Sequence, residues 1–192
     1  MDAQAGTRVE ERLQEMLLDG RLLVTTDGAA VGRVNGLSVY DLGYHAFGKP
    51  TRITASAAPG RIGIINIERE AQLSGSIYDK GVLIISGYLR RRLADAGPLT
   101  LSASLAFEQS YAGVDGDSAS IAEVAALVSE LSGLPADQAI AITGSINQHG
   151  EVQPVGGVNE KLSGYHALVA ARGLSGAHAA ILPRQNVADL ML

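Results

Sequence analysis

Three residues in the second half of the chain have side chains that could cooperate in nucleophilic chemistry. Ser118 precedes an apolar repeat of helical spacing, Thr143 ends an apolar run, and Lys161 lies near the start of a second helical repeat. A serine hydroxyl becomes a good nucleophile when a neighbouring base takes its proton, and lysine is a base only when neutral. Because the unperturbed pKa of lysine is about 10.4, a catalytic lysine must be largely desolvated. Val158 and Leu162 give Lys161 apolar neighbours in the sequence.

The same residues also have ordinary structural interpretations. A serine before an amphipathic helix is most often an N-cap, and on pattern alone capping is the more frequent outcome for Ser118. A serine at a helix start would also lie close to free backbone N–H groups that can stabilise an oxyanion. Lysines such as Lys161 are most often solvated. The Gly156-Gly157 pair is not part of a P-loop, because the G-x-x-x-x-G-K-[ST] pattern is absent from the chain.

Composition limits the classes of protein to consider. The chain has 192 residues, of which 46% are hydrophobic, so one domain with a full and mainly aliphatic core is expected. A formal net charge of -5 argues against nucleic acid as a ligand. The chain has no cysteine, no apolar run long enough for a membrane span and no signal-peptide pattern. We therefore expect a cytoplasmic protein without a membrane segment.

Hydrophobic periodicity predicts an alternation of helices and strands. Helices are expected at 8–18, 76–96, 121–131 and about 158–172, with stops at Gly20, Gly97-Pro98, Gly133 and Gly173. Strands are expected at 31–39, 52–57, 62–67, 99–107, 139–143, 152–155 and 179–182, with a turn at 144–150. The second helix should bury the face of Ile77, Ile84, Ile85, Tyr88 and Leu89, and the third that of Ile121, Val124, Ala125, Val128 and Leu131. The predicted fold class is α/β (α+β) in a compact single domain.

Other polar residues give weaker signals. The four histidines, His45, His149, His166 and His178, are scattered without ligand spacing, so no metal site is expected. Asp115 and Asp117 could form an acid/base pair or bind Mg²⁺, but no third carboxylate lies near them in the sequence. Their ordinary interpretation is capping of a loop.

Several segments together resemble the proteolytic domain of the Lon family of ATP-dependent proteases. They are Phe107-Glu108-Gln109-Ser110-Tyr111, Asp115-Gly116-Asp117-Ser118-Ala119-Ser120, Ala141-Ile142-Thr143-Gly144, Gly150-Glu151-Val152-Gln153-Pro154-Val155-Gly156-Gly157 and Glu160-Lys161-Leu162. The resemblance covers residues 107–183 and, more loosely, 31–192. It implies a serine endopeptidase in which Ser118 is the nucleophile, Lys161 the general base and Thr143 a hydroxyl that helps to hold the lysine. Asp115 and Asp117 match acidic positions of the loop before the serine.

The resemblance also implies an organisation beyond this domain. The bacterial form of the family commonly has proline where this chain has Asp117, whereas the archaeal form and some bacterial relatives have aspartate. Members form hexameric rings, fed with unfolded or damaged proteins by an upstream ATPase. We therefore expect a homo-oligomer, and we expect ATP and Mg²⁺ to bind only to an ATPase domain outside this chain, with no cofactor in the chain itself. Residues 1–20 are expected to be an N-terminal helix, which either packs on its own domain or is the tail of that ATPase domain, and residues 21–192 a proteolytic domain truncated at its C-terminus.

Two function classes follow from these observations. The first is a peptidase that forms an acyl-enzyme on Ser118. The second is a catalytically silent domain of the same fold that serves ring assembly or substrate docking. Asp117 adds a hypothesis to the first class, because its carboxylate could hold Lys161 charged and so keep an isolated domain inactive.

Overall fold

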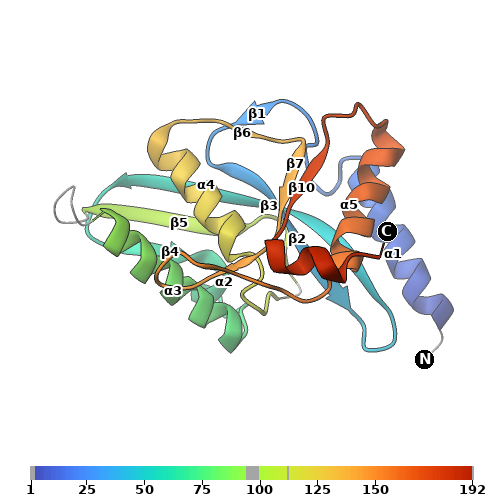
Figure 1. The fold of residues 1–192 in the computed structure, drawn as a ribbon, viewed down its shortest axis with the longest axis horizontal. Coiled ribbons are helices and arrows are strands. Elements are labelled where there is room, and N and C mark those ends of the chain that lie inside the picture. The colour runs from blue at the N-terminus through green and yellow to red at the C-terminus, as the bar shows by residue number, and fades with distance from the viewer. Residues whose placement is uncertain (1–2, 94–99, 112, 192) are drawn as a thin grey trace.

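The computed structural model describes residues 3–93, 100–111 and 113–191 of the chain. Its helices and strands are interspersed along the chain, with runs of consecutive strands over residues 29–66 and 136–153 (Figure 1). The predicted helix end at Gly97-Pro98 and the predicted strand start at Leu99 lie outside the described residues.

A mixed six-stranded sheet in the order β10-β7-β2-β3-β5-β4 forms the centre of the fold. Its strands are β2 (Arg33–Asp41), β3 (Ala46–Pro59), β4 (Gly63–Asn66), β5 (Leu101–Phe107), β7 (Ile140–Ile142) and β10 (Ala179–Ile181). Strands β2 and β3 form a long hairpin in which Val39 pairs with Gly48, and β5 runs antiparallel to β3. Strand β7 lies parallel to both β2 and β10, and β4 parallel to β5. This mixed sheet with its helices confirms the predicted fold class, α/β (α+β).

Two short ribbons complete the strands, β1 (Ala29–Ala30) with β6 (Ala136–Asp137) and β8 (Ser145–Ile146) with β9 (Val152–Gln153). The predicted turn and return strand at 144–155 are thus a small hairpin. The strand predicted at 62–67 is shorter than expected, because Ile67 begins the short helix α2 (Ile67–Glu70). Asn66 ends the strand and caps this helix, since its side chain accepts a hydrogen bond from the Arg69 amide at 3.1 Å.

The longer helices cover opposite faces of the sheet. They are α1 (Ala3–Leu18), α3 (Ser76–Leu93), α4 (Ser120–Ser132) and α5 (Val158–Arg172), and a 3-10 helix, η2 (Arg184–Asp189), follows β10. Val34 of β2 packs in the core cluster that contains residues of α3 and α4, whereas Leu37 packs against Tyr165 and Val169 of α5. Because residues an odd number apart in a strand point to opposite faces, α3 and α4 lie on one side of the sheet and α5 on the other.

The buried faces of two helices differ from those predicted. On α3, Ile77 is 54% exposed, and the helix instead buries Tyr78, Gly81, Val82, Ile85 and Leu89. On α4, Val128 and Leu131 are 49% and 41% exposed, whereas Glu123 is only 1% exposed. A tyrosine, a glycine and a hydrogen-bonded glutamate therefore occupy positions that an apolar pattern assigns to solvent.

The N-terminal helix packs on the rest of the domain. Leu17 of α1 is buried with Leu22, Val24 and Leu168. The guanidinium of Arg172, at the end of α5, donates hydrogen bonds to the carbonyl oxygens of Leu17 and Val24 at 2.6 and 2.7 Å. These contacts fit a helix that belongs to this domain, while the boundary at residue 20 and the link to an ATPase domain stay predictions.

Candidate active site

Ser118 lies in the turn that leads into α4. The helix itself begins at Ser120, its N-cap residue is Ala119, and no side chain caps it. The capping interpretation of Ser118 is therefore wrong, and its hydroxyl makes no hydrogen bond to any residue that the structure describes. Ser118 is half-buried, so its hydroxyl is free for another role.

Thr143 joins the Ser118 loop to the central sheet. It follows β7, is 1% exposed, and donates from its hydroxyl to the Ser118 carbonyl oxygen at 3.2 Å. The same oxygen accepts a hydrogen bond from the Gly144 amide at 2.7 Å, and the Thr143 amide donates to the Ile181 carbonyl at 2.9 Å. These hydrogen bonds fix the backbone of Ser118 in space relative to β7 and β10.

Lys161 lies in the first turn of α5 and is only 2% exposed. The helix approaches β3 closely at two glycines. A Cβ on Gly48 would overlap the Glu160 carbonyl oxygen and lie 2.8 Å from the Lys161 Cα, and a Cβ on Gly164 would overlap the Gly48 carbonyl oxygen. Glycine at both positions lets the backbones meet, which sets the depth at which Lys161 enters the domain.

Burial changes the acid–base chemistry of this lysine. Desolvation lowers the pKa of Lys161 to about 8, against the opposing effects of the negative charges of Asp117 and Glu160, which raise it. With this pKa, an appreciable fraction of the Lys161 amine is uncharged near pH 7, as a general base requires.

Asp117 lies close enough for its charge to act on Lys161, but the two are not paired. Its carboxylate oxygen Oδ2 accepts a hydrogen bond from the Ser145 hydroxyl at 2.7 Å. Among the described residues, neither Asp117 nor Ser118 makes a hydrogen bond or ion pair with the Lys161 amine. Catalytic hydrogen bonds are often long before substrate binds, so Ser118 and Lys161 remain candidate partners.

Asp115 has a structural contact. Its oxygen Oδ1 accepts a hydrogen bond from the Tyr78 amide at 3.2 Å, in the first turn of α3. Hydrogen bonds from the Gly116, Tyr78 and Ile77 backbones hold the pKa of Asp115 below its ordinary value. Asp115 thus ties the Ser118 loop to α3, in line with the capping interpretation.

Three residues of the site were not singled out from the sequence. Ser145 is 3% exposed and orients Asp117, and only its position two residues after Thr143 could have suggested it. Gly48 and Gly164 could not be identified as a contact, because they are far apart in the chain and glycine has many uses.

The described residues also bear on metals and membranes. No group of three or more His, Cys, Asp or Glu among them is arranged to hold a metal ion. No helix within the described ranges has the length and apolar character needed to cross a bilayer.

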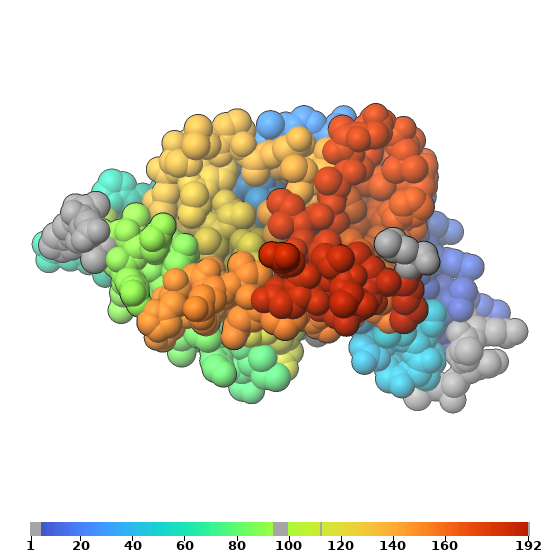
Figure 2. Space-filling view, in the orientation of Figure 1, coloured from blue at the N-terminus to red at the C-terminus, as the bar shows by residue number. Residues whose placement is uncertain are grey.

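The face that carries the 145–157 hairpin is continuous with the C-terminal segment. Figure 2 shows residues 145–157, in orange, and η2, in dark red, together on this face. The Asn186 side chain of η2 connects them, since it accepts a hydrogen bond from the Val155 amide and donates one to the Val155 carbonyl, both at 2.9 Å. The segment that leads to Lys161 is therefore anchored from outside the sheet.

Comparison with known proteins indicates the family of this chain. The family model of the Lon protease (S16) C-terminal proteolytic domain matches residues 108–191. A Lon protease homolog of Escherichia coli (strain K12) is 45% identical over 184 residues, which are 95% of this chain and 31% of that protein. The corresponding Haemophilus influenzae protein is 42% identical over 186 residues, 96% of this chain and 31% of that protein.

An archaeal relative is similar over the same extent. The archaeal Lon protease of Archaeoglobus fulgidus is 35% identical over 197 residues, which cover 96% of this chain and 28% of that protein. The chain thus spans about a third of the length of these relatives. Ser118, Thr143 and Lys161 all fall inside the region that the family model matches. The chain therefore belongs, over that region, to the family of Lon C-terminal proteolytic domains.

Proposed function

We propose that this chain is a serine endopeptidase domain in which Ser118 is the nucleophile and Lys161 the general base. The observation that carries the proposal is the burial of Lys161, whose lowered pKa, about 8, suits it to accept the proton of a serine. Membership of the Lon proteolytic family supports the same reaction class.

In this mechanism the neutral Lys161 amine takes the Ser118 hydroxyl proton as the oxygen attacks a peptide carbonyl carbon. The protonated lysine then gives the proton to the leaving amine, and water hydrolyses the resulting acyl-enzyme by the reverse sequence of proton transfers. Thr143 has lone pairs left to accept a hydrogen bond from the lysine while it donates to Ser118. Its hydroxyl would then hold both partners.

The developing oxyanion needs hydrogen-bond donors at the start of α4. The amides of Ser120 and Ile121 already donate to the carbonyl oxygens of Asp117 and Gly144, at 3.1 and 3.2 Å. The Ala119 amide, directly after the nucleophile, finds no acceptor among the described residues. It is therefore our candidate for the oxyanion donor.

The wider biology is proposed from the family alone. We propose that the substrates are unfolded or damaged proteins, that the domain acts in the cytoplasm within a homo-oligomeric, hexameric ring, and that ATP hydrolysis by a separate domain delivers the substrate. The chain itself is proposed to need no cofactor, because the Ser-Lys reaction uses only side chains and water.

The test is casein cleavage, without ATP, by the chain and its Ser118→Ala and Lys161→Ala variants. Lys80→Ala is the matched control, because Lys80 is exposed on α3. The proposal expects cleavage by the chain and the control and none by the other two. If casein is not cut and a peptide boronate forms no adduct on Ser118, the domain is the catalytically silent form that serves assembly or docking.

A further inference from the structure

A cavity of 360 Å³ lies beside the candidate active site. It is bounded by α1, the β2–β3 hairpin and residues from the segments 107–111 and 113–115. Its volume is within the range of small-ligand sites. Two of its lining residues connect it to the site. Asp115 belongs to the Ser118 loop, and the Val39 side chain lies against Gly157, just before α5, since its Cγ2 is 2.5 Å from the position of a Cβ on Gly157.

The lining of this cavity combines apolar surface with one unpaired cation. Met16, Val39 and Phe107 supply apolar walls, and Lys49 of β3 lies among them. Within the described part of the chain, the Lys49 amine makes no hydrogen bond and no ion pair. Burial lowers the pKa of Lys49, and no neighbouring charge opposes this effect.

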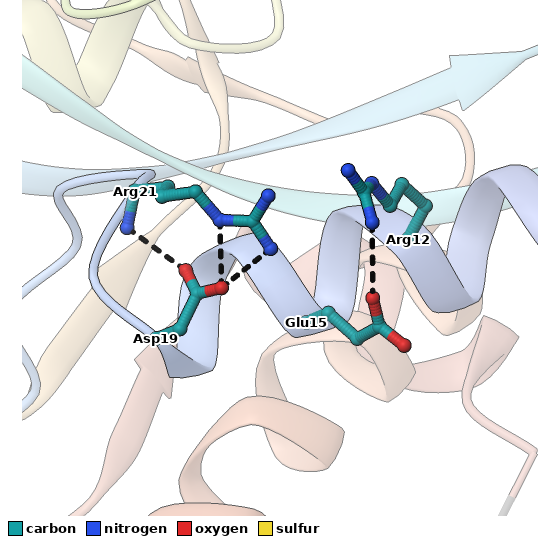
Figure 3. A network of polar contacts seen from close by, with 4 residues as sticks. All are labelled: Arg12, Glu15, Asp19 and Arg21. Atoms are coloured by element: carbon teal, nitrogen blue, oxygen red, sulfur yellow. Dashed lines mark hydrogen bonds and ion pairs between the residues drawn. The ribbon is translucent and has the colours of Figure 1, made fainter.

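The other charged groups of the lining already have partners. Arg21 is held by Asp19, whose carboxylate accepts from the Arg21 Nε at 2.6 Å, as Figure 3 shows. Asp115 accepts from the Tyr78 amide. Lys49 is therefore the charge in this cavity whose desolvation is not compensated by the protein, and an anionic ligand would compensate it.

We propose that Lys49 binds a carboxylate of the peptide substrate in this cavity, so that the domain prefers peptides with an acidic side chain near the bond that is cut. The inference rests on the proposed function, because it assigns the carboxylate to a peptide that the domain cuts. The apolar walls would contact the methylene groups of the same side chain, which favours glutamate over aspartate.

The experiment measures kcat/KM for internally quenched peptides that differ only in glutamate or glutamine at successive positions around the cleaved bond. At one position the intact chain should prefer glutamate about tenfold, as expected for a charge-assisted hydrogen bond. Lys49→Met should abolish this preference, and Lys49→Glu should reverse it. Lys80→Met removes the same charge from an exposed site and should keep the preference.

A second pair of peptides separates two sources of the carboxylate. If Lys49 instead bound the chain terminus, replacing the C-terminal acid by an amide would lower kcat/KM and the side-chain pairs would not differ, which would overturn the proposal. Equal kcat/KM for every glutamate and glutamine pair would overturn it too and leave the peptidase assignment intact.

Binding of the labelled glutamate peptide to Ser118→Ala, measured by fluorescence anisotropy, tests the cavity without turnover. Binding that depends on Lys49 in a chain that cuts nothing would retain an acidic-ligand site and reject the peptidase.

Discussion

The Thr143 hydroxyl donates a hydrogen bond to the Ser118 carbonyl oxygen at 3.2 Å. This contact joins the end of a central strand to the residue proposed as the nucleophile. Because the Gly144 amide donates to the same oxygen at 2.7 Å, the loop would keep one of its two tethers if the hydroxyl were removed. The two tethers can therefore be separated by substitution.

Thr143→Val should lower kcat by about tenfold while the fold is kept. The valine preserves the shape but removes the hydroxyl that positions Ser118 and, in the proposed mechanism, Lys161. Thr143→Ser is the matched control and should retain most of the activity, because it keeps the hydroxyl. Peptide kinetics measure the effect, and a urea midpoint checks the fold. Equal kcat in the valine variant and the parent chain would remove Thr143 from the mechanism.

The pH dependence of kcat/KM should report the ionisation of Lys161. Its pKa is lowered to about 8, and only the neutral amine can act as the base. Activity should therefore rise as the pH increases through about 8 and level off above it. A profile already flat between pH 6 and 9 would contradict the assignment of Lys161 as the base.

Asp117→Asn should shift the rise of kcat/KM to lower pH and so raise activity near neutral pH. The Asp117 charge raises the Lys161 pKa, so its removal lowers that pKa and increases the neutral fraction. The asparagine oxygen can still accept the Ser145 hydrogen bond, which preserves the local geometry. Asp27→Asn, at an exposed position, is the control for the charge change and should leave the profile in place. If kcat/KM of Asp117→Asn rises at the same pH as in the parent chain, the inhibitory role of this carboxylate is rejected.

Glu123→Gln should stabilise the protein above pH 8. Burial raises the pKa of Glu123 to about 8, so the folded chain keeps a proton that the unfolded chain loses near pH 4.5. The contribution of Glu123 to the free energy of unfolding should thus be greatest below pH 4.5 and fall as the pH rises to about 8. Glutamine keeps the acceptor for the Tyr78 hydroxyl, 2.7 Å away in the parent, and removes the ionisation.

Urea unfolding between pH 5 and 9 measures this difference. The slope should become smaller but not vanish, because burial also raises the pKa of Glu68. Glu11→Gln, on the exposed side of α1, should follow the parent curve. A Glu123→Gln curve parallel to the parent across the range would show that Glu123 is ionised in the fold.

Gly164→Ala should cost about 1–3 kcal/mol of stability and lower activity. A Cβ there would overlap the Gly48 carbonyl, so α5 would have to move away from β3 and take Lys161 with it. Gly87→Ala is a matched change in α3, where the nearest atom to the new Cβ is 3.5 Å away, and it should be neutral or stabilising. Thermal unfolding and peptide cleavage test both variants. Unchanged Tm and activity in Gly164→Ala would show that the helix tolerates the displacement.

The sequence allowed some parts of this structure to be predicted and not others. The bounds of α5 were predicted correctly, because Gly157 and Gly173 flank a helix with clear start and stop signals. The buried faces of α3 and α4 were not, because Tyr78 and Glu123 satisfy each other by a hydrogen bond that a polar–apolar pattern cannot show. Burial in these helices is decided by partners distant in the chain.

The site shows the same division. Ser118, Thr143 and Lys161 can be proposed from the sequence, because each lies in a contiguous short motif that resembles the family. The orientation of Asp117 by Ser145 and the close approach of Gly48 to α5 depend on how distant segments pack. Such contacts arise from the tertiary fold, and single-residue patterns do not contain them.

The placement of α4 and α5 on opposite faces of the sheet has a consequence for biosynthesis. Ser118 precedes α4 and Lys161 lies in α5, so the two cannot be positioned together until β7 has paired with β2 and both helices have docked on the sheet. A chain still emerging from the ribosome therefore has no assembled site in the proposed mechanism. If Ser118 and Lys161 are the proposed nucleophile and base, peptidase activity can appear only after the segment up to α5 has been made and has folded.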